Sequence, residues 1–85
     1  MTAYKLSDAD FAEISGLLKS KGKLDKFILK ELYGDKWESK GDGDERRVYG
    51  QDFGSDVENG RFPDVKFIGI RRSGRDAEYS FLPDL

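Results

Sequence analysis

All the arginines of this sequence lie in its second half, and arginine is the residue type here with the most distinctive binding chemistry. A guanidinium group is planar and carries several N–H donors, so it suits phosphates and guanine edges better than lysine does. A search for a binding surface therefore begins in the second half of the chain. The arginines are Arg46, Arg47, Arg61, Arg71, Arg72 and Arg75.

Three of these arginines surround a Ser-Gly pair in the stretch Ile70–Asp76, which reads IRRSGRD. The pair predicts a tight turn between two strands. At the tip of such a hairpin, Arg71, Arg72 and Arg75 would lie over phosphates or enter a minor groove, where the negative potential favours arginine. A solvated turn that binds nothing is the alternative.

The other candidate contacts lie on a predicted helix that begins after Asp44 as N-cap and ends near Glu58, before Asn59-Gly60. At 100° per residue, its apolar side chains share one face and its polar side chains lie opposite. Arginine and glutamine at adjacent turns suit guanine and adenine edges, a serine can contact a base or a phosphate, and a further arginine can brace the backbone. The candidate residues on this helix are Arg46, Arg47, Gln51 and Ser55.

Carboxylates on the same helix oppose this interpretation. Glu45, Asp52 and Asp56 are predicted to form an acidic line along one flank, where they would repel phosphate. The chain has a net charge of −2 and a pI of about 5.1, whereas DNA-binding domains are usually basic. A protein partner, or a phage-type anti-defence inhibitor that imitates DNA with its carboxylates, is therefore the alternative function.

Catalysis is not expected. The sequence has no cysteine and no histidine, so thiolate chemistry, nucleophile–histidine pairs and most zinc sites are excluded. The stretch GDGDE lacks the ligand ladder of a calcium loop. We expect no catalytic residue, no metal and no cofactor. With neither a signal peptide nor a membrane-spanning stretch in the sequence, we expect a cytoplasmic location and no membrane contact.

Local patterns predict the elements that position these residues. Ser7 caps a first helix from about Asp8 to Lys21. A short extended segment at 26–28 precedes one or two helical turns that end at Gly34. In the last third, VKFIGI and the alternating stretch 77–81 predict a hairpin, with Gly69 as a bulge.

This order of elements is that of a winged helix-turn-helix. The predicted fold class is therefore α+β, with three helices and a C-terminal β-hairpin. It forms one domain over residues 1–85, with loose ends at 1–6 and 83–85. The segment 27–70 also resembles a family of small bacterial and phage domains with the pattern Phe-x-Leu-Lys-x-Leu-aromatic-Gly, Trp, Arg-x-x-Gly-x-x-Phe. The matching positions are Phe27, Leu29, Lys30, Leu32, Tyr33, Gly34, Trp37, Arg47, Gly50 and Phe53.

The sequence thus leads to the hypothesis of a small winged-helix module that binds double-stranded DNA, with a protein-interaction module as the alternative. The resemblance supports the fold and implies no activity. A homodimer is compatible with both functions, because one winged helix reads few base pairs.

Overall fold

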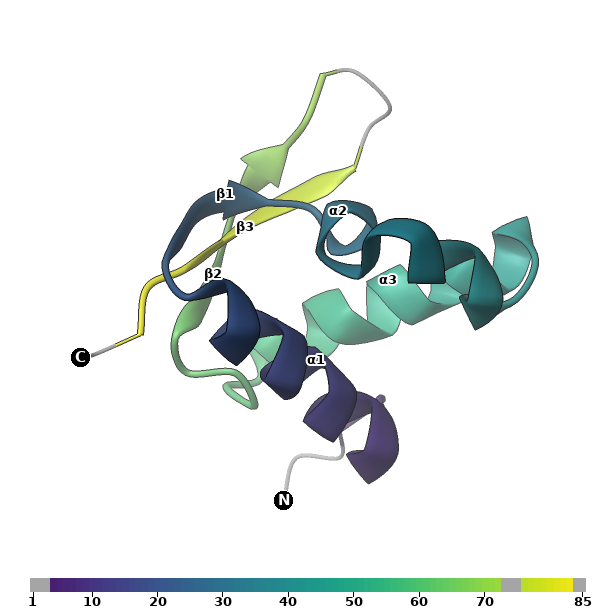
Figure 1. Cartoon of the computed structure of the whole chain (residues 1–85), viewed down its shortest axis with the longest axis horizontal. Coiled ribbons are helices and arrows are strands. Elements are labelled where there is room, and N and C mark those ends of the chain that lie inside the picture. The colour runs from purple at the N-terminus through teal and green to yellow at the C-terminus, as the bar shows by residue number, and fades with distance from the viewer. Residues whose placement is uncertain (1–3, 73–75, 84–85) are drawn as a thin grey trace.

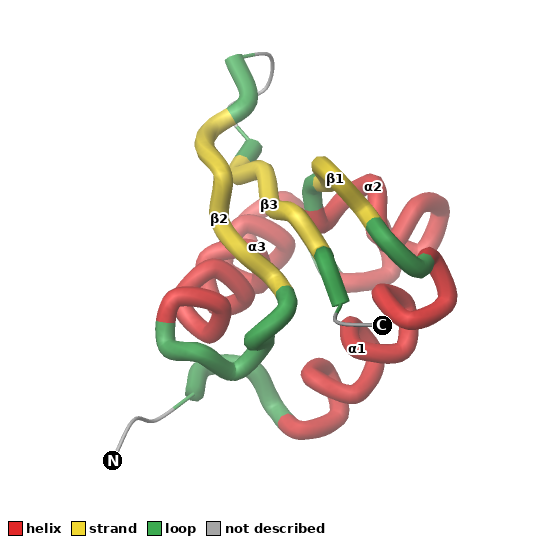
Figure 2. Tube along the Cα trace, turned by 90° about the vertical axis from the view of Figure 1, so that its left-hand side faces the viewer, coloured by secondary structure: helices red, strands yellow, loops and turns green. Residues whose placement is uncertain are grey.

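The protein folds into a layer of helices packed on one face of a three-stranded antiparallel sheet (Figures 1 and 2). A computed structural model describes residues 4–72 and 76–83. This architecture agrees with the predicted α+β class. The helices are α1 (Asp8–Lys21), α2 (Leu29–Tyr33), the 3₁₀ helix η1 (Gly34–Lys40) and α3 (Gly43–Glu58).

The sheet joins the hairpin to a strand from the first half of the chain. Its strands are β1 (Leu24–Phe27), β2 (Val65–Ile70) and β3 (Ala77–Phe81), in the spatial order β1-β3-β2. The register shifts between Phe67 and Gly69, and Gly69 has φ 146°. The predicted bulge at Gly69 is therefore confirmed, since positive φ favours glycine.

The first helix begins and ends where the sequence predicts. The side chain of Ser7 accepts a hydrogen bond from the backbone N–H of Asp10, and Gly22 follows the last turn with φ 74°. Ile14 and Leu18 are its buried residues. The apolar spacing and the two end signals are sufficient to define this helix.

Helix α3 begins two residues earlier than a cap at Asp44 would place it. Asp42 is the N-cap: its side chain accepts from the N–H of Glu45, and the Glu45 side chain accepts from the N–H of Asp42. This reciprocal pair is a capping box, which satisfies two otherwise unpaired donors. The prediction of Asp44 as the cap was wrong because GDGDE offers two aspartates and only Asp42 lies three residues before a glutamate.

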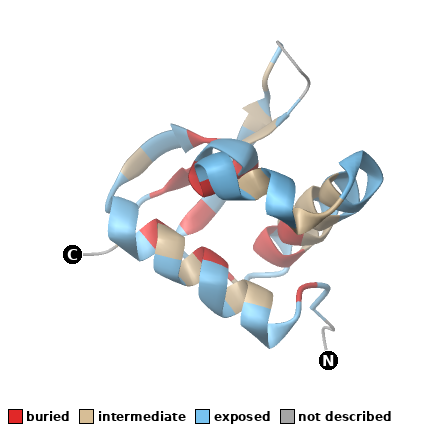
Figure 3. Ribbon diagram, turned by 45° about the vertical axis from the view of Figure 1, so that its right-hand side comes forward, coloured by how far each residue is buried: buried red, intermediate tan, exposed pale blue. Residues whose placement is uncertain are grey.

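The core lies between the helical layer and the sheet (Figure 3). Its centre is aromatic: the ring of Phe53 on α3 is 4.9 Å from the ring of Tyr79 on β3 and 5.1 Å from that of Phe62. Phe53 is completely buried. The sheet and α3 are therefore held together at the middle of α3, which fixes the position of the residues on either side of it.

The segment before α1 is not a loose end at residues 5 and 6. The carboxylate of Asp56 accepts hydrogen bonds from the backbone N–H groups of Lys5 (2.7 Å) and Leu6 (3.0 Å). The Leu6 side chain is buried in the core. These bonds connect the start of the chain to α3.

Candidate nucleic-acid interface

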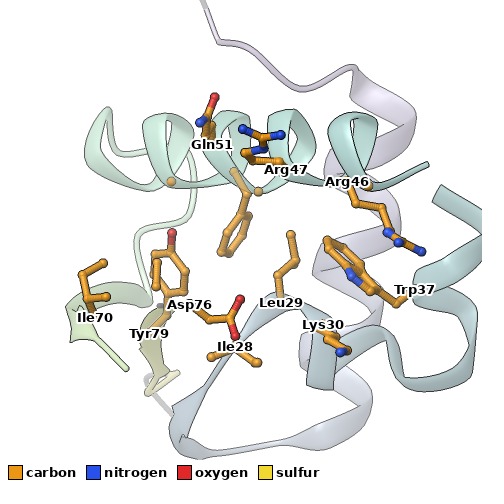
Figure 4. A pocket seen from close by; sticks show the side chains of 15 residues that line it. Ile28, Leu29, Lys30, Trp37, Arg46, Arg47, Gln51, Ile70, Asp76 and Tyr79 are labelled. Atoms are coloured by element: carbon orange, nitrogen blue, oxygen red, sulfur yellow. The ribbon is translucent and has the colours of Figure 1, made fainter. Parts of the chain in front are cut away.

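A groove of about 650 Å³ opens between α3, the start of α2 and the hairpin (Figure 4). Its deepest part consists of core side chains, and its rim is polar. Arg46, Lys30 and Trp37 lie together at one end of the groove, and Ile70 and Tyr79 lie at the other. The complete lining is Ile28, Leu29, Lys30, Trp37, Gly43, Arg46, Arg47, Gly50, Gln51, Phe53, Gly54, Ile70, Asp76, Ala77 and Tyr79.

The groove is cationic, although the whole chain is acidic. Lys30, Arg46 and Arg47 line it together with one carboxylate, that of Asp76. The bulk net charge of −2 therefore does not describe this surface. An anionic ligand would meet a local excess of positive charge here.

The helix α3 supplies one wall of the groove, and its capping box fixes where that wall begins. Arg47 and Gln51 are exposed one turn apart, as predicted. Arg47 also forms an exposed ion pair with Asp44 in the turn before it, with 2.5 Å between Nη2 and Oδ1. Such a surface pair contributes little and can be exchanged for a pair with a phosphate.

Two further candidates on α3 are less exposed. Arg46 is half-buried and extends toward Trp37 (Figure 4). Ser55 is half-buried, and its hydroxyl accepts a long hydrogen bond of 3.5 Å from the side chain of Asn59. Ser55 lies outside the groove lining, so the structure brings together Arg46, Arg47 and Gln51 but not Ser55.

Two glycines line the same wall for different reasons. A Cβ at Gly54 would lie 2.9 Å from the hydroxyl oxygen of Tyr79, so close packing requires glycine there. A Cβ at Gly50 would meet no described atom within 4 Å, and φ at Gly50 is not positive. Packing therefore accounts for Gly54 but not for Gly50.

Trp37 is positioned by a cluster of polar and aromatic groups beneath η1. The hydroxyl oxygens of Tyr33 and Tyr49 are 2.5 Å apart, and Trp37 packs 5.7 Å and 6.1 Å from the centroids of their rings. The ammonium of Lys40 lies over both tyrosine rings and forms an ion pair with Glu13. Burial and the hydrogen bond to Tyr49 raise the pKa of Tyr33, so the pair stays neutral.

The two hairpin arginines that the structure describes, Arg71 and Arg72, differ in their surroundings. The guanidinium of Arg71 lies between two carboxylates, 3.1 Å from Glu31 on α2 and 3.3 Å from Glu78 on β3. The hydrogen bond from Arg71 lowers the pKa of Glu31, which therefore remains ionised at neutral pH. Arg72 is exposed, and Arg75 lies outside the described residues. Arg71 thus connects the hairpin to α2 through ion pairs, and two carboxylates already balance its positive charge.

The predicted acidic flank of α3 is wrong at Asp56. Its side chain is completely buried and pairs with Arg61 at 3.0 Å, in addition to its bonds to the N–H groups of Lys5 and Leu6. Burial alone would raise the pKa of Asp56, but these hydrogen bonds and the ion pair lower it. Asp56 and Arg61 therefore form a structural pair, and the flank that remains consists of Glu45 and Asp52.

Among the groove residues that the sequence did not assign to a site are Lys30 and Trp37. Both belong to the pattern Phe-x-Leu-Lys-x-Leu-aromatic-Gly and Trp, which suggested core and turn positions. The sequence carried no further signal for them, because Lys30 and Trp37 meet in the groove only when α2, η1 and α3 pack together. No helix within residues 4–72 and 76–83 is long and apolar enough to cross a membrane.

Comparisons with known proteins identify a family without an assigned activity. Residues 12–79 match the family model described as "Domain of unknown function (DUF1413)". Searches of curated proteins and of solved structures give no match. The functional argument therefore depends on the geometry of the groove.

Proposed function

The chain belongs to the DUF1413 family, and because that family's description assigns no activity, we propose from the groove that this member is a small DNA-binding module of the winged helix-turn-helix type. The order α1, β1, α2, α3, β2, β3, with η1 between α2 and α3, supports the proposal. In winged helices, a helix in the position of α3 lies in the major groove and the hairpin lies beside it.

The observation that carries the proposal is the separation of opposite charges around α3. Arg46, Arg47 and Gln51 line the groove, which faces the hairpin. Asp52 lies about 140° around the helix from Arg47, at 3.6 residues per turn, and Asp56 is buried. Apart from Asp44, which pairs with Arg47, and Asp76 on the opposite side of the groove, the charged groups that a phosphate would meet on the groove side of α3 are therefore cations.

On this proposal, Arg47 and Gln51 contact base edges, Arg46 and Lys30 contact phosphates, and Arg72 contacts the backbone from the hairpin. The N-terminal half of α3 suits this role because its residues at adjacent turns are exposed on one side. A major groove about 12 Å wide admits a helix of this kind.

Salt-dependent binding of a labelled duplex tests the proposal. Fluorescence anisotropy with mixed-sequence DNA should show binding at about 50 mM salt that falls steeply at about 200 mM. The double substitution Arg46→Ala with Arg47→Ala should reduce the magnitude of the slope of log affinity against log salt by about 1, for the lost phosphate contact of Arg46, and should weaken binding further through the lost base contact of Arg47.

Lys21→Ala provides a control that removes one positive charge from the exposed end of α1. It should leave the slope within error of the native value. If Lys21→Ala and the double arginine variant reduce the slope equally, the duplex is attracted nonspecifically by positive charge. Absence of duplex binding at both salt concentrations would refute the proposal.

A protein partner is a second candidate, and the outer edge of the sheet favours it. Strand β2 forms one edge of the sheet, and Phe67, Ile68 and Ile70 on it are 56%, 48% and 59% exposed. Exposed apolar edge strands pair readily with other chains. This candidate predicts a complex that survives nuclease treatment, is lost in Ile68→Lys and persists when Arg46 and Arg47 are replaced.

A further inference from the structure

The groove contains a glycine that the fold does not require. Gly50 lies inside α3, where glycine costs about 1 kcal/mol relative to alanine. Its φ is not positive, and no described atom lies within 4 Å of the position of a Cβ. The effect of Gly50 is to leave the wall of the groove without a side chain.

At Gly50 this wall is a strip of bare helix backbone facing core side chains, whereas one turn further along Gly54 is covered by the Tyr79 hydroxyl. Leu29 and Tyr79 are almost completely buried, so they offer the groove little more than their edges. A flat ring can lie against such a strip, whereas a side chain at position 50 would occupy the space. The described cavity of about 650 Å³ falls within the range of small-molecule sites.

The positive charges of the groove favour an anionic group as the other half of the ligand. Lys30 and Arg46 lie at the Trp37 end of the groove, and Arg47 lies on the rim. Gln51 and Asp76 are exposed on opposite sides, one able to donate and accept hydrogen bonds and the other able to accept them. The groove therefore combines a cationic end, a flat wall at Gly50 and polar groups that can bind the edge of a ring.

We propose that the groove binds one nucleotide with an unpaired base, its phosphate near Lys30 and Arg46 and its ring against the helix backbone at Gly50. This site goes beyond duplex binding, because a base in a duplex is stacked and paired and cannot enter the groove. A free nucleotide and a nucleotide of a single strand share this chemistry. Because Arg47 and Gln51 contribute to both surfaces, nucleotide and duplex compete.

The sole tryptophan of the sequence lines the groove, so its emission reports on occupancy. The protein is titrated with each of the four ribonucleoside 5′-monophosphates, with adenosine, with inorganic phosphate and with a single-stranded oligodeoxyadenylate, and calorimetry is run in parallel. At least one monophosphate or the oligonucleotide should give a saturable signal. Adenosine and phosphate should each bind at least tenfold more weakly, because each offers half of the contacts.

The response to the probes identifies the source of the nucleotide. Binding of a monophosphate indicates a free nucleotide, and binding of the oligonucleotide alone indicates a single strand. Either result supports the site. No signal by emission and calorimetry overturns the proposal, as does phosphate binding equal to that of every nucleotide, which would indicate a simple anion site.

Gly50→Leu tests the location of the site without weakening the helix, since leucine is a better helix former than glycine. It should fill the groove and weaken nucleotide binding at least tenfold. Gly16→Leu is the matched control on α1, where a Cβ also meets no described atom within 4 Å, and it should bind as the native protein does. Native binding by Gly50→Leu would refute the groove as the site.

Arg46→Gln gives a second variant that keeps the bulk of the groove wall. It should weaken binding of the monophosphate tenfold and leave binding of adenosine unchanged, because only the phosphate contact is lost. Failure of duplex binding with retained nucleotide binding would refute the proposed DNA-binding function alone. The reverse result would refute only the nucleotide site.

Discussion

Asp56 shows how one residue can change its role when distant parts of the chain meet. Its place on α3 is five residues before Arg61, but it also accepts hydrogen bonds from Lys5 and Leu6, about fifty positions earlier. Helical spacing alone predicts that Asp56 lies beside Asp52 on a solvent-exposed face of α3. Its burial could not be predicted, because it depends on where the N-terminal segment lies.

Asp56→Asn should lower the free energy of unfolding by about 3 kcal/mol at pH 7, since Arg61 would lose its buried charged partner and keep only the exposed Asp8. The folded-state pKa of Asp56 is below its ordinary value of 3.8. The ionised carboxylate therefore stabilises the fold above about pH 4, and this contribution is lost as the pH falls through the lowered pKa.

Urea unfolding of both proteins between about pH 3 and pH 7 measures the effect. The difference between native protein and Asp56→Asn should shrink toward acid pH. Asp52→Asn on the same helix should stay within about 0.5 kcal/mol of native, since Asp52 has no hydrogen bond or ion pair to a described residue. A difference for Asp56→Asn that is constant with pH would contradict the assigned role of the charge.

At the scale of elements, features encoded by neighbouring residues were predictable. The cap and spacing of α1 and the strands and bulge of the hairpin are local patterns, and the structure confirms them. Helix η1 was missed because GDKWESK carries no apolar periodicity, and its position depends on the contacts of Trp37 and Lys40 with Tyr33 and Tyr49.

The two glycines of α3 should respond oppositely to alanine. Gly50→Ala should raise the free energy of unfolding by about 0.5–1 kcal/mol, because the Cβ meets open space and the unfolded chain loses entropy. Gly54→Ala should leave the free energy of unfolding unchanged or lower it, because its Cβ would lie 2.9 Å from the Tyr79 hydroxyl oxygen.

Tyr79→Phe removes that oxygen and provides the test of the cause. In this background, Gly54→Ala should become as favourable as Gly50→Ala, and a double-mutant cycle from urea unfolding gives the coupling energy. If Gly54→Ala is equally costly with phenylalanine at position 79, the contact with the hydroxyl is not the reason for glycine.

For binding by the whole molecule, the distribution of charge over the surface matters more than the net charge. The sequence indicated where the arginines are but not which of them are already paired within the protein. Arg71 is held by Glu31 and Glu78, whereas Arg47 pairs only with the exposed Asp44 and Arg46 has no ion pair with a described residue. Side-chain partners forty positions apart, such as Glu31 and Arg71, meet only after the hairpin packs near α2, so their pairing could not be predicted.

Glu31→Gln should therefore increase duplex affinity, because it releases Arg71 from one of its two carboxylates. The slope of log affinity against log salt should grow in magnitude by about 1 if the released guanidinium reaches a phosphate. Asp52→Asn removes the same charge from the far flank of α3 and should change the slope little. Equal effects of the two variants would indicate a response to net charge only.

The bonds that hold the start of the chain to Asp56 come from main-chain N–H groups, which every residue except proline possesses. Substitution at position 5 therefore leaves this attachment intact unless the new residue is proline. Position 6 must also remain apolar, because the Leu6 side chain is buried. Sequence change is thus tolerated very unevenly across this attachment: freely at Lys5, within limits at Leu6, and least at Asp56, whose carboxylate binds both N–H groups as well as Arg61.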